Sequence, residues 1–478
     1  MSKFITSSLW NFVANFIVRV MSIITFPFLV RFFLREDISV FKSFQAFVLI
    51  LMTIIPIGTN ILYLSAPPET RETRWNLFFY VSLITAILFS IVLLLSDTIT
   101  AFFLRNQLGG YLRILLIMLP LLEGIKGIVI TKLSSSLDFK GISIALICKQ
   151  ILLYAGIISF AYFNPTLGIL LFIVFFSEIL ELIMLLNHTR QINVSIKPYK
   201  EYKKFNLDRT AKKFIAYSGV EQIILTFAIQ FPTIFVVIVL GETLAPEFQL
   251  PFSAVALPVS LVMNSIARVS FPHYSNLREN EKITNSLFSL LFPVTFLLFP
   301  VLIGIHFFAR EITYLFFDKS WQMAIFSLQL FPLLMIAYIL GIPSTFVSNI
   351  KQKPHINLIY SIVLLASRIL SIYFGYKLAG FKGTIIFFVA GDVIIRIVRL
   401  KIDMRLLTLS LRKFFFYIRF NLLTSLLLFA LMWLGFLLSH QKIISFIAAL
   451  FVTVSLNYYL EKRKIKEVAL KLRGAIWK

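Results

Sequence analysis

Apolar stretches recur along the whole chain, and they constrain its fold more than any other feature. A helix that crosses a bilayer needs roughly 20 mostly apolar residues, because each residue adds only about 1.5 Å of length. We divided the sequence at clusters of charged residues, proline and glycine, which leaves a series of candidate spans. They lie near 7–31, 43–65, 76–96, 112–131, 142–162, 166–187, 214–240, 249–271, 285–308, 323–348, 356–378, 381–400, 415–438 and 443–460. This pattern predicts an all-α membrane protein with about 14 transmembrane helices.

The composition supports this interpretation. Hydrophobic residues make up 59% of the 478 residues, charged residues only 14%, and the mean hydropathy is +0.89. In an ordinary soluble domain, about a quarter of all residues are charged. A single soluble core cannot bury so large an apolar surplus, so the bilayer must surround most of these side chains.

The basic residues indicate the orientation of the chain. A net charge of +24 also occurs in nucleic-acid-binding proteins. Here, however, the lysines and arginines form short runs between apolar stretches, as expected for cytoplasmic loops of a membrane protein. The strongest runs are 188–213 and the tail after Leu460. We therefore expect both termini in the cytoplasm and no nucleic acid as a partner.

The position of the first strong basic run predicts two lobes. We expect an N-terminal six-helix lobe at 1–190, a basic cytoplasmic linker at 191–213 and a C-terminal six-helix lobe at 214–405. Two additional transmembrane helices at 406–460 and a basic cytoplasmic tail at 461–478 would follow. Such internal repeats are common in transporters.

Metal, redox and nucleotide chemistry have no sequence signature. Cys148 is the only cysteine, so no disulfide can form within the chain, and the five histidines show no ligand spacing. A Walker A motif is absent as well. We expect no metal and no cofactor, and any energy for transport would come from an ion gradient or from the membrane potential.

Polar residues form stripes on several predicted spans. In the first span, Asn11, Asn15 and Arg19 belong to a stripe that covers an arc of about 120°. Arg19 lies about 18 Å along the helix from Ser7, near the bilayer centre. The eighth span carries Asn264 and Arg268 in a similar stripe. Such stripes either line a shared cavity or join helices by hydrogen bonds.

Charged side chains within the spans are more informative, since each costs roughly 2.5–3.5 kcal/mol at the bilayer centre. The deeper cations are Arg19, Lys126, Lys149, Arg268 and Arg368, and the acids are Glu123, Glu178, Glu181, Glu221 and Asp392. Helical spacing pairs Glu123 with Lys126 and Asp392 with Arg396. The acids can therefore act as ion-pair partners or as a relay for a coupling proton or sodium ion.

The excess of cations favours an anionic substrate. One guanidinium group can bind two phosphate oxygens at once. An ammonium group attracts the same oxygens as a point charge. A phosphate or pyrophosphate head group would supply the missing negative charge. The predicted substrate-binding residues are Arg19, Asn11, Asn15, Lys126, Lys149, Asn264, Arg268 and Arg368.

Four segments carry a resemblance to a known family. They are FPFLVRFF at 26–33, LPVSLVMNSIARVSFPHYSNL at 257–277, EITYLFFDKSWQMA at 311–324 and LAGFKGTIIFFVAGDV at 378–393. In order and spacing they resemble polysaccharide transporters of the multidrug/oligosaccharidyl-lipid/polysaccharide exporter superfamily, close to O-antigen flippases.

The resemblance implies a V-shaped transporter of two six-helix bundles that works by alternating access. It implies a substrate, undecaprenyl-pyrophosphate-linked oligosaccharide, that moves from the cytoplasmic to the periplasmic leaflet of the bacterial inner membrane. Arg19 occupies the place of a first-helix arginine that holds pyrophosphate in related lipid flippases. A polysaccharide polymerase and a chain-length regulator would be further partners.

Two alternatives belong to other functional classes. A multidrug or cation exporter of the same superfamily would use cavity carboxylates, which the cationic excess disfavours. A membrane glycan polymerase or ligase would present a long external loop or an acidic surface motif, and the predicted external loops are short. We therefore expect a transporter and not an enzyme.

Overall fold

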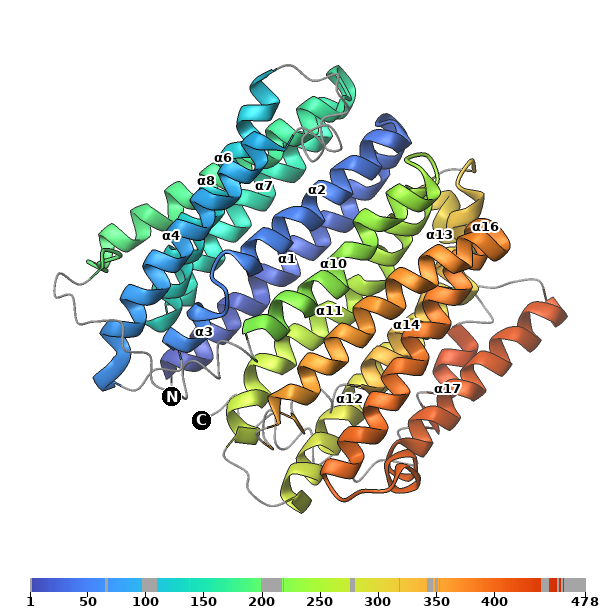
Figure 1. Cartoon of the computed structure of the whole chain (residues 1–478). Coiled ribbons are helices and arrows are strands. Elements are labelled where there is room, and N and C mark those ends of the chain that lie inside the picture. Colours follow the sequence, from blue (N-terminus) through green and yellow to red (C-terminus); the bar gives the residue numbers. More distant parts are fainter. Residues whose placement is uncertain are drawn as a thin grey trace. The chain divides into compact units, whose positions relative to one another are not determined.

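The computed structural model describes residues 2–64, 68–96, 110–136, 138–198, 217, 219–275, 280–317, 319–341, 347–348, 351, 353–439, 447–453, 455–456 and 459. All the regular elements within these ranges are helices (Figure 1). They are α1 (Ser2–Phe32), α2 (Arg35–Ile54), α3 (Thr59–Leu64), η1 (Pro68–Thr70), α4 (Arg71–Leu95), α6 (Gly110–Ser135), α7 (Phe139–Phe163), α8 (Leu167–Gln191), α10 (Val220–Leu240), α11 (Ala245–Ser275), α12 (Asn280–Phe307), α13 (Ala309–Phe316), α14 (Gln322–Leu340), α16 (Pro354–Leu406) and α17 (Leu411–Ser439).

The helices have the length and apolar character that a bilayer requires. Among the described residues, nine helices can cross a membrane, and the number is ten if α12 and α13 form one bent span. These two helices meet at an angle of 76°. The all-helical membrane fold predicted from the sequence is confirmed, whereas the count of fourteen spans stays a prediction.

The second span begins earlier than the sequence predicts. We expected it at 43–65, but α2 runs over Arg35–Ile54 and ends before a turn in which Ile57 and Gly58 have positive φ angles of 46° and 73°. Glu36 and Asp37 lie in the first turn of α2, where negative charge is favourable. As a result, Lys42 lies inside a membrane span and not in a loop.

Helix α16 contains a break at the position where the sequence predicts a boundary between two spans. Ala379 and Gly380 have non-helical backbone angles, and φ of Gly380 is +59°. Glycine adopts this conformation without a Cβ clash. The break falls between the predicted spans 356–378 and 381–400.

The chain forms two compact units. The first contains Met1–Gln249, Phe316–Asp318 and Pro354–Phe381, and the second contains Leu250–Leu315, Lys319–Lys353 and Lys382–Lys478. Within the first unit, α1 packs on α7, α4 packs on α6, α7 packs on α8 and α2 packs on α10. Within the second unit, α12 packs on α14 and α17. The predicted lobes at 1–190 and 214–405 stay a prediction.

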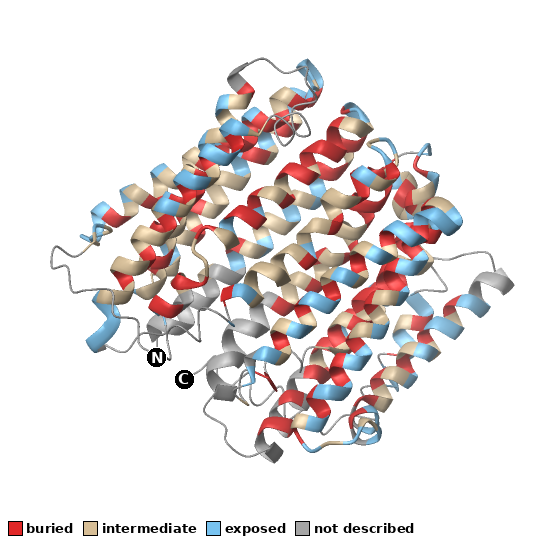
Figure 2. Ribbon diagram, viewed as in Figure 1, coloured by how far each residue is buried: buried red, intermediate tan, exposed pale blue. Residues whose placement is uncertain are grey.

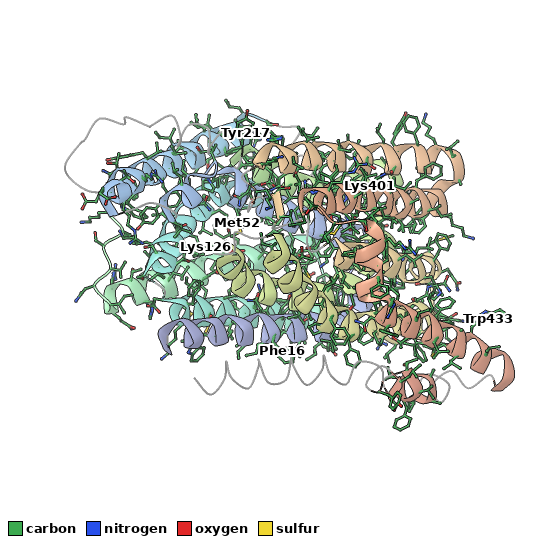
Figure 3. All side chains as sticks on the ribbon, turned by 90° about the horizontal axis from the view of Figure 1, so that it is seen from below. Phe16, Met52, Lys126, Tyr217, Lys401 and Trp433 are labelled. Carbon is green, nitrogen blue, oxygen red and sulfur yellow. The ribbon has the colours of Figure 1, made fainter. Side chains whose placement is uncertain are left out.

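Many large apolar side chains are exposed on the helices. Figure 2 shows buried and exposed stripes along the same helices. Phe16 and Trp433 are 51% and 55% exposed, and Figure 3 shows them at the edge of their own helices. Lys126, in contrast, is fully buried. Apolar side chains outside and charged side chains inside are the arrangement expected when lipid surrounds the helices.

Candidate functional site: buried charges of the helical bundle

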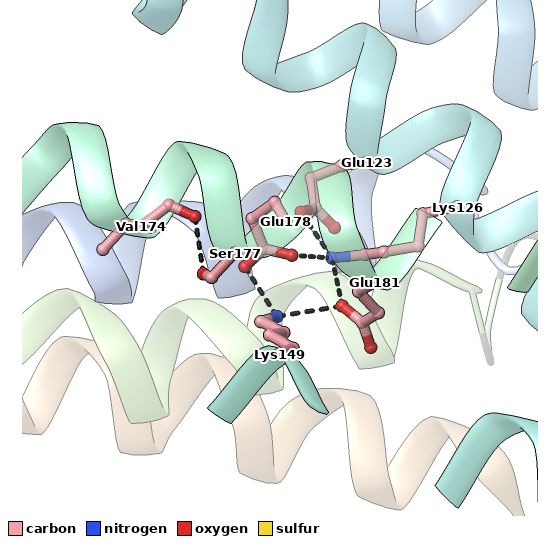
Figure 4. Close-up of polar contacts among 7 residues, drawn as sticks. All are labelled: Glu123, Lys126, Lys149, Val174, Ser177, Glu178 and Glu181. Carbon is pink, nitrogen blue, oxygen red and sulfur yellow. Dashed lines mark hydrogen bonds and ion pairs between the residues drawn. The ribbon is translucent and has the colours of Figure 1, made fainter. Parts of the chain in front are cut away.

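Five charged side chains from α6, α7 and α8 form an ion network within the first unit (Figure 4). The ammonium nitrogen of Lys126 lies 2.7 Å from Glu123 Oε1 and 3.1 Å from Glu181 Oε2, and it also contacts Glu178. Lys149 lies 2.6 Å from Glu178 Oε1 and 3.0 Å from Glu181 Oε2. The predicted pair of Glu123 and Lys126 is confirmed.

The three carboxylates of this network outnumber its two ammonium groups. Glu178 and Glu181 each contact both lysines, but Glu123 contacts Lys126 alone. The second oxygen, Glu123 Oε2, is buried and has no hydrogen-bond partner among the described residues. The network therefore carries one excess negative charge, and its least compensated oxygen belongs to Glu123.

Arg368 has a main-chain partner. Its Nη1 donates a 2.6 Å hydrogen bond to the carbonyl of Ala228 in α10. In a regular helix this carbonyl accepts from the N–H of residue 232, but residue 232 is proline and has no N–H. Arg368 therefore satisfies a carbonyl that Pro232 leaves without its helical donor, and this gives the arginine a structural role.

Two further buried arginines pair with acids on their own helix, in the second unit. Arg396 Nε lies 2.8 Å from Asp392, which confirms the predicted pair. Arg399 lies 2.7 Å from Asp403 and donates to the Ser348 hydroxyl at 2.6 Å. Because these contacts compensate the charges, both sets stabilise the fold of the unit.

Arg19 has a different environment. It is half-buried in α1, and its charge acts on Lys42 of α2 and on Tyr154 of α7. The Tyr154 hydroxyl also shares a hydrogen bond with Ser22. In the part of the chain that the structure describes, neither Arg19 nor Lys42 forms an ion pair with a carboxylate. Two like charges thus lie on neighbouring helices of an apolar bundle.

Lys42 is a candidate site residue that the sequence interpretation does not include. Its ammonium group lies 5.6 Å from the centre of the Phe26 ring and donates to Gln45 at 3.3 Å. The signal that indicates it is a single lysine that directly follows Val40 and Phe41 and precedes the apolar run 46–52. A span that begins at residue 43 places Lys42 in a loop, because charged residues mark the predicted span boundaries.

The remaining predicted residues have varied positions. Asn15 and Glu221 are half-buried in α1 and α10, and each has an interaction partner. The side chains of Asn11, Asn264 and Arg268 lie outside the described residues, although their backbones are helical. Their predicted substrate contacts stay predictions.

The second unit also contains an apolar cavity. Its volume is about 600 Å³, and its lining comes from α14, α16 and α17. Leu333, Ile386 and Phe415 are among the lining residues, and Arg396 is the charged one. No sequence pattern indicated this cavity, because its residues come from three separate helices.

A family profile decides the identity of the chain. The profile described as "Polysaccharide biosynthesis protein" matches residues 28–326. The chain belongs to the polysaccharide biosynthesis protein family. This membership and the multi-pass helical fold confirm the predicted resemblance to polysaccharide transporters of the superfamily.

A relative of this polysaccharide biosynthesis protein comes from Klebsiella pneumoniae. It is described as an uncharacterized membrane protein in the cps region and is 26% identical over 157 residues. The match covers 33% of this chain and 32% of the relative, so it spans about a third of either protein.

Solved structures of MATE transporters share the fold of this polysaccharide biosynthesis protein. A MATE protein in complex with MaL6 is 14% identical, has a TM-score of 0.62 and matches over 84% of this chain and 96% of its own. Inward-facing and outward-facing structures of a multidrug resistance MATE transporter of the MOP superfamily have TM-scores of 0.58 and 0.60, with 16% and 17% identity. They match over 84% of this chain and over 94% and 95% of their own. At such low identity the likeness establishes a transporter fold alone.

Proposed function

We propose that this protein is a flippase for undecaprenyl-pyrophosphate-linked oligosaccharide, such as an O-antigen repeat unit. The observation that carries the proposal is that Arg19 and Lys42 lie half-buried on neighbouring helices, α1 and α2, and form no ion pair with a carboxylate among the described residues. Two cations that repel each other in an apolar bundle are stabilised by an anion that binds both. A pyrophosphate offers several oxygens, so it can accept from a guanidinium and an ammonium group at once.

The remaining parts of the proposal follow from the family resemblance. We infer fourteen transmembrane helices, arranged as two six-helix lobes in a V shape and two additional C-terminal helices. The protein would work by alternating access in the bacterial inner membrane, with both termini in the cytoplasm. The pyrophosphate would bind Arg19 and Lys42 from the cytoplasmic side. A polymerase and a chain-length regulator would act on the translocated product.

A multidrug exporter is the second candidate, since the MATE neighbours share the fold. Export of a cationic drug requires a carboxylate that the drug can reach. Glu123, Glu178 and Glu181 are instead buried and paired with Lys126 and Lys149. This arrangement favours the anionic substrate.

Replacement of Arg19 and Lys42 by alanine tests the proposal in cells. We expect loss of surface glycan and accumulation of the lipid-linked intermediate, with normal amounts of protein in the membrane. Arg310→Ala is the matched control, because Arg310 is exposed and donates a 3.1 Å hydrogen bond to the Tyr314 hydroxyl on its own helix. Normal surface glycan in the Arg19→Ala/Lys42→Ala variant would refute the proposed anion site.

A further inference from the structure

The charges of the buried ion network do not balance, which indicates that the network binds a positively charged ligand. Two ammonium groups face three carboxylates, and the whole network is enclosed by α6, α7 and α8 (Figure 4). An uncompensated charge inside a membrane protein is strongly unfavourable. One additional positive charge would remove the imbalance.

The geometry also indicates where that charge would bind. Glu178 and Glu181 each contact two lysines, so both carboxylates are well compensated. Glu123 has one lysine contact, through Oε1, and its side chain is fully buried. Its Oε2 is without a hydrogen-bond partner in the described part of the chain.

A proton fits this position better than a metal ion does. Sodium and other hard cations require several oxygen ligands around one point. The point that is nearest to all three carboxylates is already occupied by the ammonium group of Lys126. A proton needs only one oxygen, and Glu123 Oε2 supplies it.

We propose that the network of Glu123, Lys126, Lys149, Glu178 and Glu181 is a proton-binding site, with the proton on the Glu123 carboxylate. The role of this proton in coupling rests on the proposed transport function. Binding converts Glu123 from carboxylate to carboxylic acid and leaves two carboxylates against two ammonium groups. Release restores the excess negative charge.

The network and Arg19 lie on neighbouring helices, because Lys149 and Tyr154 belong to α7, and α7 packs on α1, which carries Arg19. The charges of both Arg19 and Lys149 act on the Tyr154 hydroxyl. An anion bound at Arg19 and Lys42 would therefore change the potential at Lys149 and at its two glutamate partners. Through this electrostatic interaction, substrate and proton would influence each other.

Other ionisable groups lie mostly at the ends of the surrounding helices. Arg19 of α1 and Lys42 of α2 belong to the same unit as the network. Helix α4 has no charged residue from Trp75 to Leu95. The remaining ionisable groups of α1, α2, α4, α6, α7 and α8 include Arg31, Arg35, Glu36, Asp37, Arg71, Glu72, Arg74, Tyr80, Arg113, Lys132, Lys140, Cys148, Tyr154, Tyr162, His188 and Arg190. Glu123 is therefore the group that we expect to titrate within the network.

Infrared difference spectroscopy of the purified full-length protein tests the proposal. We expect a carboxylic-acid C=O band at neutral pH that disappears at alkaline pH and is absent from Glu123→Gln. The glutamine mimics the neutral carboxylic acid, so this variant should fold. Glu311→Gln is the control that should keep the band, because Glu311 is exposed on α13.

A second variant and a second cation sharpen the test. Glu123→Asp should keep a band at a shifted frequency, and sodium in place of potassium should leave the wild-type band unchanged. A band that persists unchanged in Glu123→Gln, or that sodium removes, would overturn the assignment. The spectra need no substrate, so their outcome is independent of the export test for Arg19 and Lys42.

Coupling of proton binding to transport is measured by a separate translocation assay. In proteoliposomes that contain undecaprenyl-pyrophosphate-linked oligosaccharide, wild-type translocation should respond several-fold to an imposed pH gradient. Translocation by Glu123→Gln should proceed at a rate that does not respond to the gradient. An equal response of wild type and variant would contradict a coupling role for Glu123.

Discussion

The guanidinium of Arg368 donates a 2.6 Å hydrogen bond to the main-chain carbonyl of Ala228. The two residues lie on α16 and α10, and Pro232 removes the N–H that would otherwise bond to this carbonyl. A bilayer has no water to replace the lost donor. A side chain that the sequence suggested as a substrate ligand thus has a backbone function.

Arg368→Met should destabilise the protein by about 1–3 kcal/mol, because the Ala228 carbonyl would be left without a donor. In a Pro232→Ala background the N–H of residue 232 is present and can bond to this carbonyl. The same Arg368→Met change should then cost clearly less. Thermal unfolding of the four purified proteins in detergent measures the coupling, and equal costs in both backgrounds would contradict the assigned role.

Lys126→Met should be one of the most disruptive single changes in the chain. It removes a fully buried cation from three carboxylates, and a broken buried ion pair typically costs about 3–5 kcal/mol. Lys149→Met should cost less, since Lys149 is 12% exposed and Lys126 would still contact Glu178 and Glu181. Membrane accumulation and melting temperature should rank wild type above Lys149→Met and Lys149→Met above Lys126→Met. The reverse order of the two variants would refute the described network.

Gly58→Ala should destabilise the turn after α2. Gly58 has a φ of +73°, and a Cβ at this position would lie 2.5 Å from the Cα of Gly219. Gly127→Ala is a suitable control, because a Cβ there meets nothing within 4 Å and alanine favours a helix. A melting temperature of Gly58→Ala equal to that of wild type would show that the two glycines do not approach this closely.

The sequence identifies the features that depend on local spacing. Long apolar stretches predict the helices, and i,i+3 or i,i+4 spacing predicts the pairs of Glu123 with Lys126 and of Asp392 with Arg396. Even the boundary inside α16 follows from the glycine at 380. Each of these features involves neighbouring residues on one helix.

Contacts that depend on packing between helices cannot be predicted from the sequence alone. Lys149 and Glu181 are 32 positions apart and meet only because α7 packs on α8. Arg368 and Ala228 are 140 positions apart. A proline four residues after Ala228 did indicate that this carbonyl needs another donor, but the sequence does not show which side chain supplies it.

Native mass spectrometry with undecaprenyl pyrophosphate tests the central claim most directly, because it measures binding of the charged lipid without the sugar. We expect wild type and Arg310→Ala to retain this lipid in preference to uncharged undecaprenol. The Arg19→Ala/Lys42→Ala variant should lose that preference by tenfold or more, since both cations that contact the pyrophosphate are gone. Equal retention of undecaprenyl pyrophosphate by the double variant and the wild type would contradict the account.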